Sequence, residues 1–202
     1  MKLEFPEFGH QSETLVAVVL GALLATLSGV IANQWEAHAR QRERERTAAL
    51  LFGEVLSTLR VLLVMAERAS VVPPAWGPVT QRMLQTARRE IGIYERNREA
   101  LVDLRDPALR ADVHRLAIQI VMPLDGILDS LKDGGADDDE RRQVGFDWLM
   151  ETSGRIPDLV ARLGRIAHHD FAHFAAAAEA AGGPQTTAAR AAARTAANAA
   201  SS

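Results

Sequence analysis

Three histidines and an aspartate near the end of the chain are its one cluster of metal-binding residue types. They are His168, His169, Asp170 and His173. On a continuous helix His169 and His173 would be one turn apart, a spacing at which two imidazoles can hold the same metal ion. The cluster offers few ligands and lacks the general base that metalloprotease helices carry. A polar face near a helix C-terminus explains the same residues, so we predict no metal site.

Other residue patterns that support catalysis are missing from the sequence. The chain has no cysteine, which excludes disulfides, thiolate metal ligands and thiol nucleophiles. It has no Gly-rich phosphate loop, nucleophile elbow or kinase motif. Asp125 and Asp129 are one helical turn apart, which is ordinary for a solvated helix face. His114 lies between Val113 and Leu116 and fits the edge of an apolar seam better than a catalytic base. We therefore predict that the protein is not an enzyme and uses no cofactor.

An uncharged apolar run, Leu15–Ala32, is the strongest organising feature of the sequence. It covers about 18 positions, or ~27 Å as a helix, close to the hydrocarbon thickness of a bilayer. Ser12 is a suitable N-cap, and Trp35 follows where an indole suits the headgroup layer. A cleaved signal peptide ending at Ala32 and a buried core helix are the alternatives. The length of the run and its charged flank favour a transmembrane helix at residues 14–34.

Basic residues predict which side of the membrane each part of the chain occupies. Lys2 is the one lysine or arginine before the apolar run, whereas four arginines follow it closely: Arg40, Arg42, Arg44 and Arg46. Cytoplasmic flanks carry the excess of such residues. We therefore expect a single-pass protein of the bacterial inner membrane. Its short N-terminal tail, residues 1–13, would be periplasmic, and the part after Trp35 would be cytoplasmic.

Small residues recur every four positions in the apolar run and would share one helix face. They are Ala17, Gly21, Ala25 and Gly29. Two helices with such faces can approach closely and pack by van der Waals contact. The pattern predicts a homo-oligomer formed through the membrane helix, although glycine and alanine are also common in membrane helices.

Four helical stretches predict an antiparallel α-helical bundle over residues 35–182. The first continues the membrane helix without a break to about Ala69, because no proline occurs between Pro6 and Pro73. The next is expected from about Thr80 to Leu104. Apolar residues at alternating spacings of three and four predict the buried faces. In the first stretch these residues are Ala48, Phe52, Val55, Leu59, Leu62 and Ala66.

Proline, glycine and capping residues set the other expected helix ends. Asp106-Pro107 is typical of a helix start, with aspartate as N-cap and proline at the first helical position. That helix should reach about Lys132 with a kink at Pro123. The last helix is expected from about Asp138 to Ala181, bent or split near Gly154. Residues 183–202 hold almost no large apolar side chain, and we expect this Ala-rich tail to be disordered.

Tyr94 and Asn97 lie in a segment with a recognisable pattern. A tyrosine, an asparagine three residues on, and two leucines before a turn resemble a segment of uncharacterised bacterial single-pass membrane proteins with a cytoplasmic α-helical domain. The membrane run and residues 49–55 are also similar, so the resemblance covers roughly residues 12–131. This chain differs at residues 105–107, Arg-Asp-Pro, where an apolar residue and two prolines are more usual. The resemblance implies an architecture and no activity.

The same two side chains have a physical interpretation of their own. We expect Tyr94 and Asn97 to form a structural polar pair, in which phenol and amide pin the turn between two helices. Contact with a ligand is the alternative.

Charge and composition narrow the remaining function classes. The net charge of −3 gives no reason for nucleic-acid binding, and aromatic residues, at 5%, are too scarce for base stacking. The expected partners are the lipid bilayer, a second copy of the chain and an unidentified protein. We predict a membrane-anchored helical interaction or scaffold module. An oligomerising membrane effector, or a small subunit of a transport complex, is the alternative.

Overall fold

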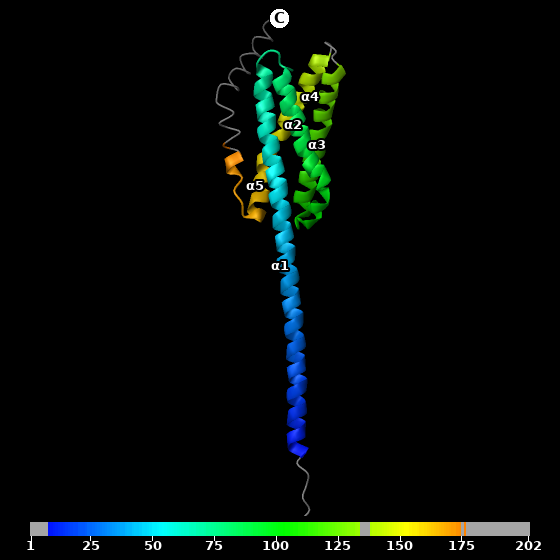
Figure 1. The fold of residues 1–202 in the computed structure, drawn as a ribbon, viewed down its shortest axis with the longest axis vertical. Coiled ribbons are helices and arrows are strands. Elements are labelled where there is room, and N and C mark those ends of the chain that lie inside the picture. Colours follow the sequence, from blue (N-terminus) through cyan, green and yellow to red (C-terminus); the bar gives the residue numbers. More distant parts are fainter. Residues whose placement is uncertain (1–7, 134–137, 175, 177–202) are drawn as a thin grey trace, which may run out of the picture. The chain divides into compact units, whose positions relative to one another are not determined.

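The computed structural model describes residues 8–133, 138–174 and 176 of the 202-residue chain. These residues form an all-α fold, as predicted, and none of them lies in a β-strand. Figure 1 shows the helices in chain order. They are α1 (Phe8–Val71), α2 (Pro78–Arg96), the 3-10 helix η1 (Arg98–Asp103), α3 (Pro107–Asp133), α4 (Asp138–Ser153) and α5 (Ile156–Ala167). The tail over residues 183–202, for which we predict disorder, lies outside the described residues.

The chain divides into two compact units, Met1–Glu43 and Arg44–Ser202. Helix α1 belongs to both, and it is unbroken from Phe8 to Val71. The prolines at positions 73, 74 and 78 follow its end and cannot continue it. The continuity of α1 matches the sequence prediction. This N-terminal helix is also long and apolar enough to cross a membrane.

Helix α1 contains two apolar stretches with different surroundings. Its Asn33–Val71 part is long and apolar enough to span a membrane, yet half of its most apolar stretch is buried inside the protein. That part also carries Glu54 and Arg60. We therefore assign its buried stretch, which begins at Ala48, to the core of the second unit. The predicted span is the earlier run, where Leu20 and Leu24 are exposed and most other side chains lie outside the described set.

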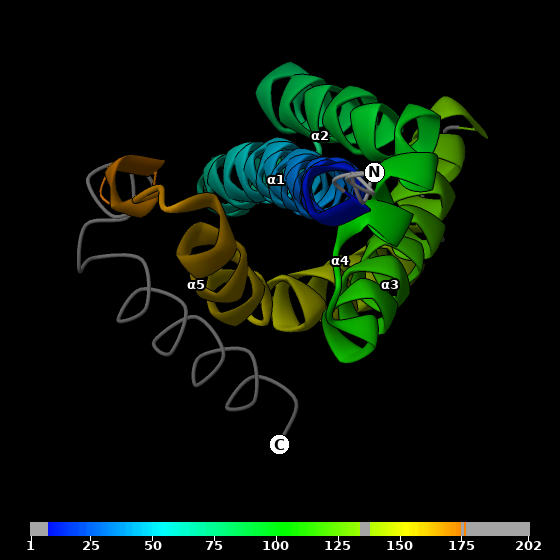
Figure 2. The same ribbon diagram turned by 90° about the horizontal axis from the view of Figure 1, so that it is seen from below.

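The core of the second unit confirms most of the predicted buried face of α1. Of its six seam residues, five are buried, and Leu62 is only partly buried because Leu63 takes the inward position. Helices α2 and α5 flank this part of α1 on opposite sides, with α3 and α4 alongside (Figures 1 and 2). The core extends into them through residues such as Leu84, Ile91 and Leu116. Burial of this continuous apolar cluster is the main stabilising contribution.

The second helix ends earlier than the apolar periodicity predicted. Helix α2 stops at Arg96, and Asn97 caps it with φ −108° and ψ 16°. The Asn97 amide Nδ2 donates to the carbonyl of Ile93 at 2.8 Å. This local bond competes with continued α-helix, so Arg98–Asp103 forms the separate η1 turn. The prediction of one helix to Leu104 was therefore wrong in its second part.

Helix α3 starts as predicted. The Asp106 carboxylate accepts from the backbone N–H of Ala108 at 2.9 Å and of Leu109 at 3.2 Å. Pro107 occupies the first helical position, where its missing N–H costs nothing. Pro123 lies inside the helix, which nevertheless runs to Asp133.

The last predicted helix is split near Gly154, which is one of the two expected outcomes, but its second part ends early. Helix α4 stops at Ser153 and α5 runs only from Ile156 to Ala167, not to Ala181. His168 has φ 50° and ψ 41°, a left-handed conformation that reverses the chain. The His169 N–H then bonds the Gly164 carbonyl at 3.0 Å, which is the six-residue bond of a Schellman motif. Burial of the Phe171 ring follows this reversal.

Candidate functional site

A tyrosine–histidine pair joins α2 to α3 in the second unit. The Tyr94 hydroxyl lies 2.7 Å from Nδ1 of His114, and the two rings are tilted with centroids 6.5 Å apart. Tyr94 is only 4% exposed, and its ring also packs on Phe52 at 5.8 Å. Burial raises the pKa of Tyr94, an effect that the nearby positive charge of Arg98 opposes. The phenol therefore stays protonated at neutral pH and donates to His114 when Nδ1 carries no proton.

This arrangement modifies the expected pairing of Tyr94 with Asn97. The tyrosine reaches across to α3, whereas the asparagine amide caps its own helix at Ile93. Both side chains hold the turn after α2, but each does so through a separate partner. The sequence identified Tyr94 and missed His114 as its partner, because residues 20 positions apart meet only when α2 and α3 pack.

Tyr94 and His114 line a groove of about 490 Å³ between the end of α2, η1 and α3. Its α3 wall is apolar, and Ile118 and Met122 are 47% and 69% exposed there. Its other wall is charged and includes Arg96 and Arg98. An apolar wall facing a few polar groups is the usual composition of a ligand site.

A second groove, of about 620 Å³, lies between α1 and α4. Trp148 and Val144 of α4 are 43% and 65% exposed, and both line it. Its lining also includes three carboxylates, those of Glu67, Asp147 and Glu151. An exposed tryptophan beside a polar rim is typical of a protein-binding surface, because such residues supply much of the binding energy of interfaces.

The one cation that lines this α1–α4 groove is held by the protein itself. The Arg60 guanidinium donates to the Ser153 hydroxyl at 2.6 Å, and burial lowers its pKa while the charge of Glu67 opposes that change. Asp147 accepts a hydrogen bond from Gln143 at 3.0 Å, and Glu151 is exposed. The net charge of the lining is negative.

The histidine cluster does not have the geometry that its sequence spacing predicted. His168 ends α5, so His169 and His173 do not lie on one continuous helix. The His169 ring packs edge-on against Phe171 at 4.7 Å and the His173 ring lies 4.1 Å from that of Phe174. Among the described residues, no group of three or more His, Asp or Glu side chains is placed to hold a metal ion.

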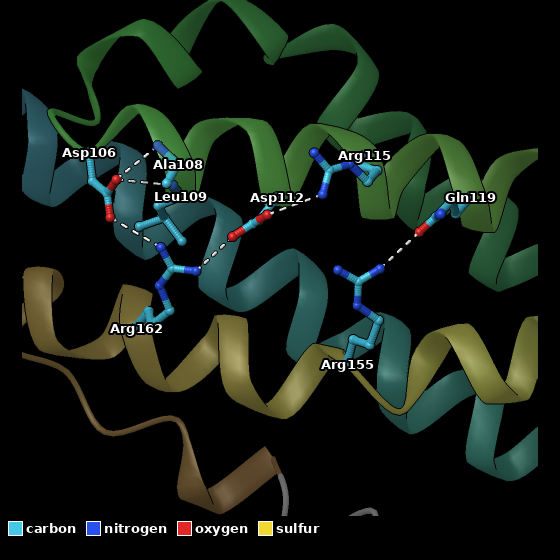
Figure 3. Close-up of polar contacts among 8 residues, drawn as sticks. All are labelled: Asp106, Ala108, Leu109, Asp112, Arg115, Gln119, Arg155 and Arg162. Atoms are coloured by element: carbon cyan, nitrogen blue, oxygen red, sulfur yellow. Dashed lines mark hydrogen bonds and ion pairs between the residues drawn. The ribbon is translucent and has the colours of Figure 1, made fainter.

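An ion-pair network fastens the start of α3 to α5 (Figure 3). Arg162 donates to Asp112 at 2.8 Å and to Asp106 at 3.1 Å. The backbone N–H of Leu109 is the main cause of the lowered pKa of Asp106, and Arg162 adds to it. The bond to Asp112 is the main cause of the raised pKa of Arg162. Asp106 and Arg162 therefore remain charged at neutral pH, which suits a structural role.

The residues predicted to anchor the chain occupy exposed positions where they are described. Trp35 is 77% exposed, and Gly21 and Gly29 are exposed with open space where a Cβ would lie. The side chains of Ala17 and Ala25 lie outside the described set. Arg40 pairs with Glu36 at 2.7 Å. Of the other flank arginines, Arg42 and Arg44 are exposed, and Arg46 Nε donates to the Ala167 carbonyl at 3.1 Å.

Comparison with known proteins gives no further assignment. No protein-family model, curated protein or solved structure matches this chain.

Proposed function

We propose that this protein is a non-catalytic, membrane-anchored helical module that recruits a protein partner at the cytoplasmic face of a bacterial inner membrane. The exposed Trp148 in the α1–α4 groove carries the proposal. Helix α4 buries Phe146 and Leu149 in the core but leaves Trp148 exposed. The exposed part of the indole is an apolar surface that a second molecule can cover.

The anchor part of the proposal depends on the uncharged run Leu15–Ala32 and its flanks. Exposed Leu20 and Leu24 suit contact with lipid, because a bilayer removes their apolar surface from water. Trp35 suits the membrane interface, and the four flanking arginines support placing the second unit in the cytoplasm.

The recruitment part depends on the charge of the α1–α4 groove. Glu67, Asp147 and Glu151 line the groove together with Trp148 and Val144, so a partner segment with basic and aliphatic residues is complementary. A cation that approaches the indole face also gains a cation–π contribution of about 0.5–1 kcal/mol at an exposed site.

Fractionation tests the anchor. We expect the full chain to remain in the membrane pellet after alkaline carbonate washing. Replacement of Leu20 and Leu24 by Lys should release it into the supernatant, whereas replacement of the exposed core-helix residue Met65 by Lys should not. Recovery of the full chain in the supernatant would contradict the anchor.

Site-specific photo-crosslinking tests the recruitment. With a photoreactive phenylalanine at position 148, we expect one discrete crosslinked protein, and Glu151→Lys should abolish it by reversing a charge of the groove. Glu54→Lys is the matched control, because Glu54 is an exposed acid on α1 that does not line the groove. Equal crosslinking in both variants would remove the charge-based recruitment.

A second candidate is self-association in the membrane. The open space at Gly21 and Gly29 supports it, since a second helix could approach there without meeting the chain's own side chains. Chemical crosslinking of the protein in membranes tests this candidate. Gly21→Leu should lower the dimer yield, and an unchanged yield would end the idea.

A further inference from the structure

We propose that the groove between α2 and α3 binds an anionic amphiphile, a molecule with an aliphatic chain and a carboxylate or phosphate head. This site is separate from the α1–α4 groove and does not depend on the proposed recruitment. It combines an exposed apolar wall with two arginines that have no ion-pair partner among the described residues.

The α3 wall would hold the aliphatic chain. His114, Ile118 and Met122 follow one another at intervals of four residues and so share one face of α3. Ile118 and Met122 are largely exposed, and Val121 lies partly buried beside them. Covering such a surface is favourable because it removes apolar area from water. The groove, at about 490 Å³, has ample room for a single chain.

The charged wall would hold the anionic head. Arg96 and Arg98 are exposed and line the groove. Two carboxylates also line it, and one of them is engaged elsewhere: Glu95 accepts from Arg88 at 3.1 Å. Glu95 and Glu99 balance Arg96 and Arg98 in formal charge, so binding of the head depends on the guanidinium groups as hydrogen-bond donors and not on a net positive charge. Guanidinium groups bind carboxylates and phosphates through paired, charge-assisted hydrogen bonds.

The Tyr94–His114 pair would lie between head and chain. Tyr94 is buried as a residue, yet it lines the groove, and its partner His114 is only partly buried. Outside the groove, Arg88 bridges α2 to Asp125 of α3 at 2.6 Å. The two helices that form the walls are therefore tied together, and the groove is formed before the ligand arrives, which lowers the entropic cost of binding.

The single tyrosine of the chain offers a specific reporter. We would prepare the full chain with ring-¹³C tyrosine in phosphatidylcholine nanodiscs and titrate it with decanoate, following the Tyr94 resonance. We expect a saturable shift. Decanol, which has the chain without the charge, and acetate, which has the charge without the chain, should each bind at least about tenfold more weakly.

Paired variants test the assigned residues. Arg96→Gln together with Arg98→Gln should weaken decanoate binding by about tenfold or more, and Ile118→Ser should also weaken it. Arg82→Gln, an exposed arginine of α2 that does not line the groove, should leave the Kd unchanged. Absence of a saturable shift, or equal binding of decanoate and decanol, would overturn the proposal, as would an equal loss in the Arg82 variant.

A further arm distinguishes a free amphiphile from a bilayer lipid. Nanodiscs in which phosphatidylglycerol replaces part of the phosphatidylcholine are compared without decanoate. A Tyr94 shift that already appears there, and that the double arginine variant removes, identifies a lipid headgroup as the source. A shift that needs added decanoate identifies a free anion.

Discussion

The ring of Phe171 lies directly over Gly53, so closely that no side-chain atom can be added to the glycine without moving the ring. Gly53 is on the bundle part of α1, and Phe171 follows the reversal after α5. The same ring also approaches Gly164, where a Cβ would lie 3.4 Å from Phe171 Cδ2. Two glycines therefore form the slot that accepts one aromatic ring and holds the end of α5 against α1.

Gly53→Ala should therefore destabilise the second unit. The new methyl group would displace a ring that is 4% exposed, and overpacking of this kind costs about 1–3 kcal/mol. Thermal unfolding followed by tryptophan fluorescence would measure the change. Gly126→Ala is the matched control, because Gly126 is exposed in α3 with open space at its Cβ position. That change should stabilise the helix by roughly 0.5–1 kcal/mol. Destabilisation of both variants alike would show that the slot is not the cause.

His168→Gly should stabilise the protein. His168 has a left-handed backbone with φ 50°, which costs an L-residue with a Cβ about 1 kcal/mol relative to glycine. His168→Ala retains the Cβ and should show no such gain, so the pair of variants separates backbone strain from loss of the imidazole. Chemical denaturation of the two variants beside the parent chain provides the measurement. A gain in the alanine variant as large as in the glycine variant would refute the backbone explanation.

Tyr94→Phe should lower stability by about 1 kcal/mol, because it leaves His114 Nδ1 without its partner. The Tyr94 hydroxyl also makes the stability of the protein depend on pH in the alkaline range. Since burial raises the pKa of Tyr94 in the folded chain, the protonated phenol favours the folded state. This contribution is complete below the unfolded-state pKa of about 10 and disappears as the pH rises through the folded-state value. Absorbance titration of the single tyrosine, with unfolding curves above pH 9 for both proteins, tests it. Equal alkaline losses in both would contradict it.

Two variants of Asp106 should separate its role as a helix cap from its role in the ion pair. Asp106→Asn retains an oxygen that can cap α3 but loses the charge that pairs with Arg162, whereas Asp106→Ala loses both. We expect the alanine variant to melt a few degrees below the parent and the asparagine variant to lie between them.

The Asp106 carboxylate also makes the stability of the protein depend on pH in the acidic range. Its pKa is lowered, first by the Leu109 N–H and also by Arg162. Its contribution is therefore complete above the unfolded-state pKa of about 4 and is lost as the pH falls through the lower folded-state value. The difference in melting temperature between parent and alanine variant should shrink below pH 4. A constant difference would show that charge plays no part.

Much of the fold followed from local rules in the sequence. The absence of proline between Pro6 and Pro73 determined a continuous α1, and the Asp106-Pro107 pair determined the start of α3, because capping and proline geometry act within a few residues. The apolar spacing predicted most of the buried face of α1 for the same reason. It failed at Asn97 and at His168, where a side-chain bond and a left-handed residue ended helices that the periodicity continued.

The sequence by itself determined the all-α class, the apolar run at Leu15–Ala32 and the lack of catalytic motifs. Only the tertiary structure brought Tyr94 to His114, fitted Phe171 over Gly53 and left Trp148 exposed on a helix that buries Phe146 and Leu149. The physical reason is the distance along the chain between the residues that interact. Helix formation and capping depend on near neighbours, whereas these contacts depend on how side chains from distant segments interlock once the helices pack.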